Sequence, residues 1–309
     1  MKDVIKNRLL KNYKHKSKWA KKNKIEAYRL YDRDIPDFPF IADIYKDQAI
    51  IYFKGNPKID DKKNHYPIFL EAIKEVCSLC DEFIYYKNRF VQDKENKYTK
   101  EDTDPIKFEV REGQYRFIVS LNKYLDSGLF LDHRPLRNIL STSHYKSVLN
   151  LFCYTGSLSV CSARVDNQVT SVDLSNTYLE WAKDNFRINN LETERHNFIR
   201  TDVFKYLETN KNKVQYDLII LDPPTFSQSK AMENTLDIQK DHLEIVKNCM
   251  SMLKQDGKMY FSNNLRDFKL SETISEKYKV IDLTKRSIPE DFRDQKIHKL
   301  FEIRHSIEQ

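Results

Sequence analysis

Three carboxylates, Asp173, Asp202 and Asp222, each follow a short apolar or β-rich run in the second half of the chain. The run before Asp222, residues 216–221, is strongly apolar, and Asp222 opens the sequence Asp-Pro-Pro-Thr-Phe. If these runs are parallel strands of one sheet, their carboxyl ends meet at one edge, where ligands bind in open α/β folds. We therefore expect the three carboxylates to line a single ligand site.

A small-residue turn at Gly156 marks the first strand of the same sheet. The apolar run that begins at Val148 is typical of a buried parallel strand, and residues 157–163 have the pattern of a short helix. A dinucleotide would need the Gly-x-Gly-x-x-Gly fingerprint, because its pyrophosphate lies against the backbone, and the sequence lacks it. One glycine suits a ligand without phosphates. The sequence therefore predicts S-adenosylmethionine (SAM) as the cofactor.

Two of the carboxylates suit the nucleoside part of SAM. Asp173 can accept both ribose hydroxyls, and each such charge-assisted hydrogen bond contributes about 1.5–3 kcal/mol. Asp202 can accept from the adenine amine beside the apolar Val203, although it is also a good N-cap for the next helix. The predicted cofactor-binding residues are Arg134, Asn150, Phe152, Tyr154, Thr155, Gly156, Asp173, Leu174, Asp202, Val203 and Asp222.

The turn after residue 221 is predicted to hold the substrate. Two consecutive prolines fix two φ angles and remove two backbone donors, so the carbonyl groups can face a planar base. Such a base would donate from its Watson–Crick edge to the carboxylate and stack on the aromatic ring. The alternative is an ordinary turn after a strand, which rarely requires an acid and two prolines. The predicted catalytic residues are Asp222, Pro223, Pro224 and Phe226.

Ten basic residues and a single acid, Asp3, lie within residues 2–24, and apolar residues recur at helical intervals between them. This pattern predicts an amphipathic basic helix. A solvated face would suffer repulsion among like charges, and a membrane-surface helix would need a broader apolar face. Binding to nucleic-acid phosphates fits best, because it would offset the repulsion. The predicted RNA-binding residues are Lys14, Lys16, Lys18, Lys21 and Lys22.

Composition excludes several classes of protein. Five cysteines in 309 residues do not make a disulfide framework. The pair Cys77-x-x-Cys80 lacks the second ligand pair of a zinc site, so we expect no metal and both cysteines on an apolar helix face. The 40% hydrophobic content is typical of a soluble chain, with neither a membrane span nor a secretory signal. We expect a cytoplasmic protein without a membrane partner.

The elements that would position these residues fall into two domains. Residues 1–125 predict a small α+β RNA-binding domain: the basic helix, a hairpin at 40–53, a helix at 62–80, a strand at 83–87, a polar loop at 93–104 and a hairpin at 106–120. Residues 126–309 alternate strands with helices at 175–189 and 235–253, and strands at 258–262, 279–283 and 298–303 follow. This order predicts an α/β, Rossmann-like class I SAM methyltransferase sheet of seven, mostly parallel strands.

The connection between the two domains ends in His133 and Arg134, before Pro135 and a helix that reaches about Leu140. If this helix packs against the first strand, both side chains lie close to the mouth of the sheet. The alternative is a joining turn whose polar residues only cap the helix.

Motifs spread along nearly the whole chain resemble those of one family. They include residues 124–134 (YLDSGLFLDHR), 149–156 (LNLFCYTG), 222–227 (DPPTFS), 239–243 (QKDHL) and 261–264 (FSNN). The chain resembles the guanine-N7 half of the bifunctional ribosomal RNA methyltransferases, RlmKL. The resemblance implies methyl transfer from SAM to guanine N7 in 23S ribosomal RNA or a pre-ribosomal RNA fragment. Because 309 residues leave no room for the guanine-N2 half, we expect a free-standing N7 enzyme.

Methylation of guanine N7 requires neither a nucleophilic residue nor a general base from the protein. N7 carries an in-plane lone pair and no proton, so alignment with the methyl group is the main requirement, and Asp222 can stabilise the positive charge that develops. Methylation of cytosine C5 would need a cysteine nucleophile, and neither 222–226 nor 262–264 contains one. Methylation of guanine N2 or another exocyclic amine remains an alternative. So does a non-catalytic RNA-binding module, which would not bind SAM.

Overall fold

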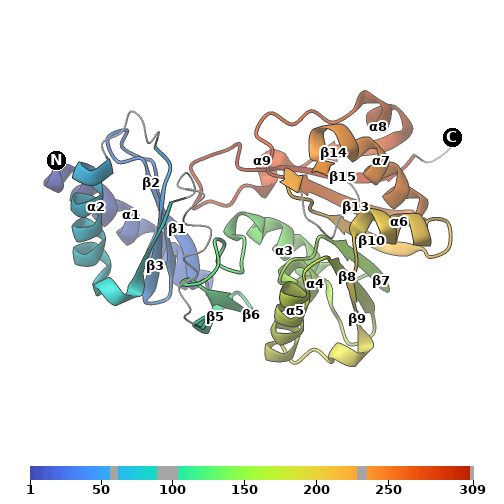
Figure 1. Cartoon of the computed structure of the whole chain (residues 1–309), viewed down its shortest axis with the longest axis horizontal. Coiled ribbons are helices and arrows are strands. Elements are labelled where there is room, and N and C mark those ends of the chain that lie inside the picture. Colours follow the sequence, from blue (N-terminus) through green and yellow to red (C-terminus); the bar gives the residue numbers. More distant parts are fainter. Residues whose placement is uncertain (56–61, 89–103, 228–234, 307–309) are drawn as a thin grey trace. The chain divides into compact units, whose positions relative to one another are not determined.

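The computed structural model describes residues 1–55, 62–88, 104–227 and 235–306. The chain forms two compact units: the first is blue to green in Figure 1 apart from one short red segment, and the second is green to red. The first contains Met1–Leu131 and Glu290–Asp294, and the second contains Asp132–Pro289 and Gln295–Gln309. The division at Leu131 lies a few residues beyond the predicted boundary at 125, and the return of 290–294 to the first unit has no counterpart in the prediction. The predicted loop at 93–104 lies, except for Asp104, outside the described residues.

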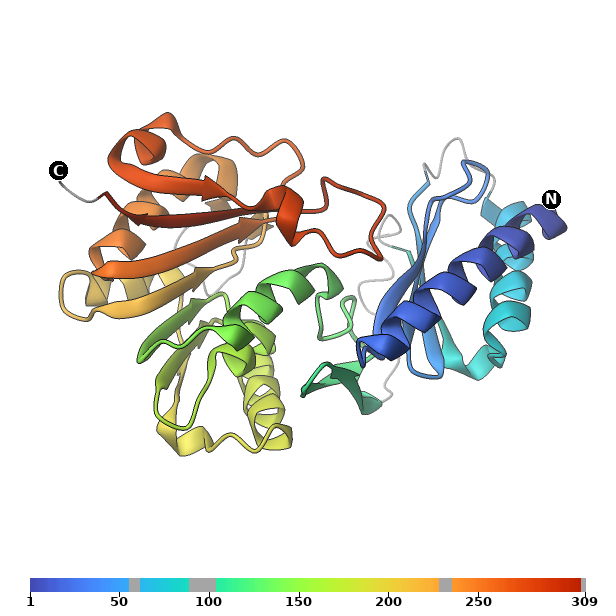
Figure 2. The same cartoon turned by 180° about the vertical axis from the view of Figure 1, so that it is seen from behind.

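A four-stranded sheet forms the centre of the first unit. Its order is β1 (Ala27–Asp32), β2 (Phe40–Tyr45), β3 (Gln48–Phe53) and β4 (Ile84–Asn88). β2 is antiparallel to both of its neighbours, and β4 is parallel to β3. Helices α1 (Lys2–Lys22) and α2 (Lys62–Cys77) lie against this sheet (Figure 2). They share a core with it, in which Ile5, Leu9 and Phe69 are fully buried. The predicted basic helix and first hairpin are confirmed.

The hairpin β5 (Lys107–Glu112)–β6 (Tyr115–Ser120) and the segment Glu290–Asp294 complete the first unit. Arg29 of β1 donates to both carboxylate oxygens of Asp43 at 2.8 and 3.1 Å. Its guanidinium carbon lies 4.0 Å from the centre of the Phe292 ring. The backbone N–H of Arg29 donates to Asp291 Oδ2 at 2.8 Å. A paired, buried arginine therefore holds a segment that is distant in the sequence.

A seven-stranded sheet forms the second unit, with helices on both faces (Figures 1 and 2). The strand order is β14 (Tyr278–Asp282), β15 (Lys299–His305), β13 (Leu253–Asn263), β10 (Tyr216–Leu221), β7 (Ser147–Leu151), β8 (Gln168–Asp173) and β9 (Asn197–Arg200). The five strands from β13 to β9 are parallel, and β15 runs antiparallel to β13 and β14. The predicted seven-stranded, mostly parallel α/β sheet is confirmed.

Helices connect these strands and cover the sheet. They are α3 (Arg134–Thr142), α4 (Ser157–Ser162), α5 (Asn176–Ile188), α6 (Val203–Asn210), α7 (Ile238–Ser251), α8 (Glu272–Lys277) and α9 (Thr284–Ser287). None of the helices in the described part of the chain is long and apolar enough to cross a membrane.

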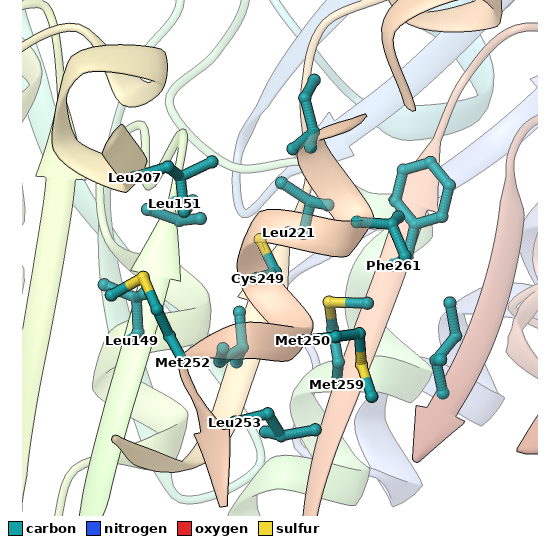
Figure 3. Packing of buried hydrophobic residues seen from close by; sticks show 14 of the residues in the cluster. Leu149, Leu151, Leu207, Leu221, Cys249, Met250, Met252, Leu253, Met259 and Phe261 are labelled. Atoms are coloured by element: carbon teal, nitrogen blue, oxygen red, sulfur yellow. The ribbon is translucent and has the colours of Figure 1, made fainter. Parts of the chain in front are cut away.

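Alternation along the strands decides which face receives which side chain. Leu151 of β7, Leu221 of β10 and Phe261 of β13 belong to the core that the strands share with α6 and α7, where the leucine and methionine side chains meet (Figure 3). Leu221 and Phe261 are direct partners in the sheet. The residues that follow them, Asp222 and Ser262, therefore turn towards the opposite face.

Three local features differ from the prediction. α7 begins three residues into the predicted helix at 235–253, because Leu236–Asp237 (β12) pairs with Phe226–Ser227 (β11). β13 begins before residue 258, because Tyr216 already pairs with Leu253. Cys80 lies beyond α2 and is exposed, so only Cys77 packs against the apolar core as predicted.

Candidate active site

The turn after β7 has an unusual backbone. Phe152, Tyr154 and Gly156 adopt left-handed conformations with φ of 57°, 51° and 73°. Two of them are not glycine, and such a conformation costs a side-chain-bearing residue about 1–2 kcal/mol. The turn is closed by a hydrogen bond from Gly156 N to the Cys153 carbonyl at 2.9 Å. Strain concentrated in one short loop at the end of a central strand is typical of a ligand-binding site.

Asp173, the last residue of β8, is oriented by this turn. Its Oδ2 accepts from Tyr154 N and its Oδ1 accepts from Ser175 N, both at 2.9 Å. Burial raises the pKa of Asp173, and these two backbone donors lower it only in part. Each oxygen keeps a second lone pair, and both are held in fixed directions. The carboxylate thus has the geometry to accept from a vicinal diol such as a ribose.

Asp202 lies at the end of the neighbouring strand β9 and caps α6. Its Oδ1 accepts from Phe204 N at 2.8 Å and from Lys205 N at 3.2 Å. The N-cap alternative is therefore observed. Both hydrogen bonds use Oδ1 of Asp202. The other carboxylate oxygen, Oδ2, can therefore make the predicted contact with adenine, beside the buried Val203.

The other predicted cofactor residues occupy different environments. Asn150 is fully buried within the sheet, and its Nδ2 donates to Ser159 Oγ of α4 at 2.8 Å. Thr155 is also buried, and its carbonyl accepts from Asn185 Nδ2. Arg134 is buried in the first turn of α3, and Leu174 follows Asp173 at a half-buried position. The contacts of Asn150 and Thr155 are internal, so the structure gives these two residues a role in holding the turn.

The turn after β10 combines a half-buried acid with an exposed ring. Asp222 follows Leu221 directly, Pro223 is buried, and Pro224 is exposed. Phe226 is 60% exposed, although its backbone is fixed by pairing with Asp237. Since large aromatic side chains are usually covered, an exposed ring four residues after an acid is a suitable platform for a planar ligand.

His133 is a site residue that the sequence left undecided. Its Nε2 lies 3.2 Å from Asp222 Oδ2, and its ring is stacked on that of His298 with centroids 5.3 Å apart. The only indication of a site role in the sequence was the position of His133, immediately before the helix α3. Its partners stand at residues 222 and 298, too far along the chain for local spacing to reveal them.

None of the five cysteines, all of which are described, is placed to act as a nucleophile beside Asp222. Cys153 and Cys249 are buried, and burial raises the pKa of both thiols well above the ordinary value. Cys249 lies among leucine and methionine side chains of the core (Figure 3). Cys161 is buried in α4, and the other two lie in the first unit. Among the described residues, no cluster of His, Cys, Asp or Glu could hold a metal ion.

The predicted RNA-binding lysines of α1 divide into two groups. Lys14, Lys18, Lys21 and Lys22 are exposed. Lys16 is half-buried, and its ammonium donates to the Arg29 carbonyl at 2.9 Å and the Asp291 carbonyl at 2.8 Å. Lys16 therefore helps to hold the segment Glu290–Asp294, and its ammonium is engaged inside the first unit rather than at its surface.

The chain is similar to one protein family, to several ribosomal RNA methyltransferases and to solved structures of the same fold. Residues 80–297 match the family of S-adenosylmethionine-dependent methyltransferases. Ribosomal RNA large subunit methyltransferase K of Neisseria meningitidis serogroup B is 47% identical over 305 residues, which cover 97% of this chain and 86% of that protein. Ribosomal RNA large subunit methyltransferase K/L of Acinetobacter baumannii (strain SDF) is 43% identical over 97% of this chain, which spans only 42% of that longer protein. The crystal structure of SMU.776 complexed with SAH has a TM-score of 0.82 and 26% identity, covering 98% of this chain and 81% of that chain.

The sheet topology, the strained turn before α4 and the acids at the strand ends define a class I methyltransferase whose cofactor is SAM. Within this class, the chain belongs to the family of the ribosomal RNA large subunit methyltransferases K and K/L. The fold class, the family and the cofactor that the sequence predicted are thereby confirmed.

Proposed function

We propose that this protein transfers the methyl group of SAM to N7 of a guanine in 23S ribosomal RNA. The relatives from N. meningitidis and A. baumannii are named as methyltransferases of large-subunit ribosomal RNA, which supports RNA as the substrate. The observation that carries the proposal is the turn after β10. It offers a carboxylate at Asp222 and an exposed ring at Phe226, at the same sheet edge as Gly156.

The proposed cofactor site uses the ends of three neighbouring strands. When bound, SAM supplies an electrophilic methyl group on a sulfonium. Asp173 would accept from the ribose hydroxyls, because Tyr154 N and Ser175 N already fix the direction of its oxygens. Asp202 would accept from the adenine amine with the oxygen that does not cap α6. These contacts would hold the nucleoside part of SAM and leave its methyl group free to meet the substrate.

The proposed substrate site works by position and charge. Phe226 would stack on the flipped guanine, and Asp222 would accept from its Watson–Crick edge, so that N7 faces the methyl group. The N7 lone pair would form the new bond to the methyl carbon that SAM supplies, the carbon–sulfur pair would leave with sulfur, and no proton would be released. Positive charge appears on the purine, and the Asp222 carboxylate stabilises it.

Product analysis tests the proposal directly. We expect the protein and SAM to convert 23S ribosomal RNA, prepared from cells that lack this protein, into RNA whose nucleosides contain 7-methylguanosine. N2-methylguanosine or 5-methylcytidine as the product would contradict the N7 assignment. Calorimetry with S-adenosylhomocysteine (SAH) tests the alternative of a non-catalytic RNA-binding module, which would give no heat of binding.

The role of Asp222 needs its own variant. We expect Asp222→Ala to lose methyl transfer while it keeps the SAH affinity of the wild type, because Asp222 is proposed to hold the base. Asp173→Ala, at the end of β8, is the matched control, since its main defect should be a loss of SAH affinity. Full activity of Asp222→Ala would rule out its proposed role.

A further inference from the structure

Asp222 is held by a buried histidine from another element. His133 immediately precedes α3, and its Nε2 lies 3.2 Å from Asp222 Oδ2. The exposed fraction is 9% for the His133 side chain and 19% for that of Asp222. No described residue makes a hydrogen bond to the other oxygen, Oδ1. One oxygen of this carboxylate is thus engaged inside the protein, and the other can meet a ligand.

A second histidine fixes the first. The rings of His133 and His298 are parallel within 5°, with centroids 5.3 Å apart. Nδ1 of His298 lies 2.9 Å from Asp132 Oδ2, and its Nε2 lies 2.8 Å from Ser287 Oγ. Both ring nitrogens of His298 therefore have partners, which define its plane. Stacking on a ring that is held at both ends limits the rotation of His133.

Charge favours the same arrangement. Burial alone would favour neutral His133, but the carboxylates of Asp222 and Asp132 outweigh it and raise the pKa of His133 to about 9. Arg137, in the first turns of α3, opposes them. His298, which stacks on the ring from the segment before β15, is a further titratable neighbour. At neutral pH, this raised pKa favours the imidazolium form of His133, which is a counter-ion for the Asp222 carboxylate.

We infer that His133 is a positioning residue, which fixes Asp222 Oδ2 through Nε2–H so that Oδ1 is directed at the Watson–Crick edge of the base. The inference rests on the proposed role of Asp222 in holding that base. Methyl transfer to an unprotonated nitrogen depends on alignment, and a misplacement of about 1 Å can lower the rate about 100-fold. A carboxylate free to rotate would leave the base without a defined orientation. The pair of His133 and His298 removes this freedom before the base arrives.

Histidine titration tests the ion pair without any substrate. Proton–nitrogen NMR spectra of the wild type should show one imidazole, assigned by its loss in His133→Gln, that stays protonated well above the ordinary range. Asp222→Asn should return this titration towards the ordinary range. An ordinary titration in the wild type, or one unchanged by Asp222→Asn, would overturn the inference, whatever the enzyme methylates.

Single-turnover rates test the positioning role. We expect His133→Ala to lower methyl transfer to 23S RNA by about 10- to 100-fold, with the SAH dissociation constant unchanged. His133→Gln keeps an N–H donor and should recover much of the rate. The wild-type rate should fall at alkaline pH as His133 loses its proton, and His133→Gln should lack this fall. Equal rates for the wild type and His133→Ala would reject the role, and the nucleoside produced by the wild type separately tests the N7 proposal.

Discussion

A methyl group on Gly156 would lie 2.7 Å from Cβ of Ala182, because the turn before α4 packs directly against α5. Gly156 also has φ of +73°, a conformation that side chains disfavour. We predict that Gly156→Ala lowers the free energy of unfolding by about 2–5 kcal/mol, the combined cost of overpacking and of the left-handed backbone. It should also weaken SAH binding, because the turn positions Tyr154 N against Asp173.

Gly113 provides the matched control for this prediction. It has a similar φ of +62°, and an added Cβ would meet no atom within 4 Å. Gly113→Ala should therefore show only the backbone cost of about 1–2 kcal/mol in urea unfolding. If the two variants lost the same free energy of unfolding, the close contact with Ala182 in Gly156→Ala would have to relax at no cost.

The raised pKa of Asp173 makes SAH binding sensitive to acid. The charged form is the better acceptor for ribose hydroxyls, and burial makes this carboxyl take up a proton at higher pH than an exposed aspartate. We predict that calorimetry shows SAH affinity falling about tenfold per pH unit once the pH drops below that pKa. Asp173→Asn should bind more weakly at neutral pH and lose this dependence. The same dependence in Asp173→Asn would assign the titration to another group.

Much of the site follows from the local sequence. Apolar runs that end in Asp173, Asp202 and Asp222 predict strands whose carboxyl ends share an edge, and the structure places these residues on β8, on the turn after β9 and on the turn after β10. The recurrence of apolar residues at helical intervals also predicts that α1 is amphipathic. These features depend on periodicity within one element, which a single sequence displays.

Contacts between distant segments could not be predicted in the same way. The pairing of His133 with Asp222 and the burial of Lys16 against the Asp291 carbonyl depend on how whole elements pack. The left-handed conformations of Phe152 and Tyr154 carry no glycine signal, so the sequence indicated one such position, Gly156, where the structure has three. Lys16 shares its residue type and its helix with the exposed lysines, and only tertiary structure distinguishes it.

The exposed ring of Phe226 predicts a defect in substrate binding without a defect in folding. Stacking of a base on an aromatic ring contributes about 1–3 kcal/mol. We predict that Phe226→Ala weakens the productive binding of RNA by about this amount, while its midpoint of thermal unfolding matches the wild type because 60% of the side chain is exposed. Phe226→Tyr retains the ring and should behave as the wild type. A loss of SAH affinity in Phe226→Ala would assign the ring to the cofactor site.

His133 gives stability a dependence on pH with a defined sign. Its pKa is about 9 in the folded protein, against about 6.5 for an unperturbed histidine. The stabilisation, on the order of 3 kcal/mol, is fully present below about pH 6.5 and is lost as the pH rises through about 9. We predict that the difference in unfolding free energy between the wild type and His133→Gln shrinks across this window. A difference that stays constant with pH would contradict the raised pKa.

The exposed lysines of α1 can be tested for RNA contact against lysines of the same helix that already have a partner. Lys2 and Lys6 both bind the carboxylate of Glu75, at 2.9 and 2.6 Å, whereas Lys14 and Lys18 are exposed further along α1. The double variants Lys2→Gln/Lys6→Gln and Lys14→Gln/Lys18→Gln each remove two positive charges from this helix.

Each phosphate contact contributes about 0.7–0.9 to the slope of log affinity against log salt concentration, because binding releases condensed counterions. We predict that Lys14→Gln/Lys18→Gln flattens the slope for binding to 23S RNA by about 1–2, and that Lys2→Gln/Lys6→Gln changes it by less than half as much. Equal flattening in the two variants would mean that RNA senses the total charge of α1 rather than contacts at Lys14 and Lys18. The comparison therefore separates a docking surface from a general electrostatic attraction.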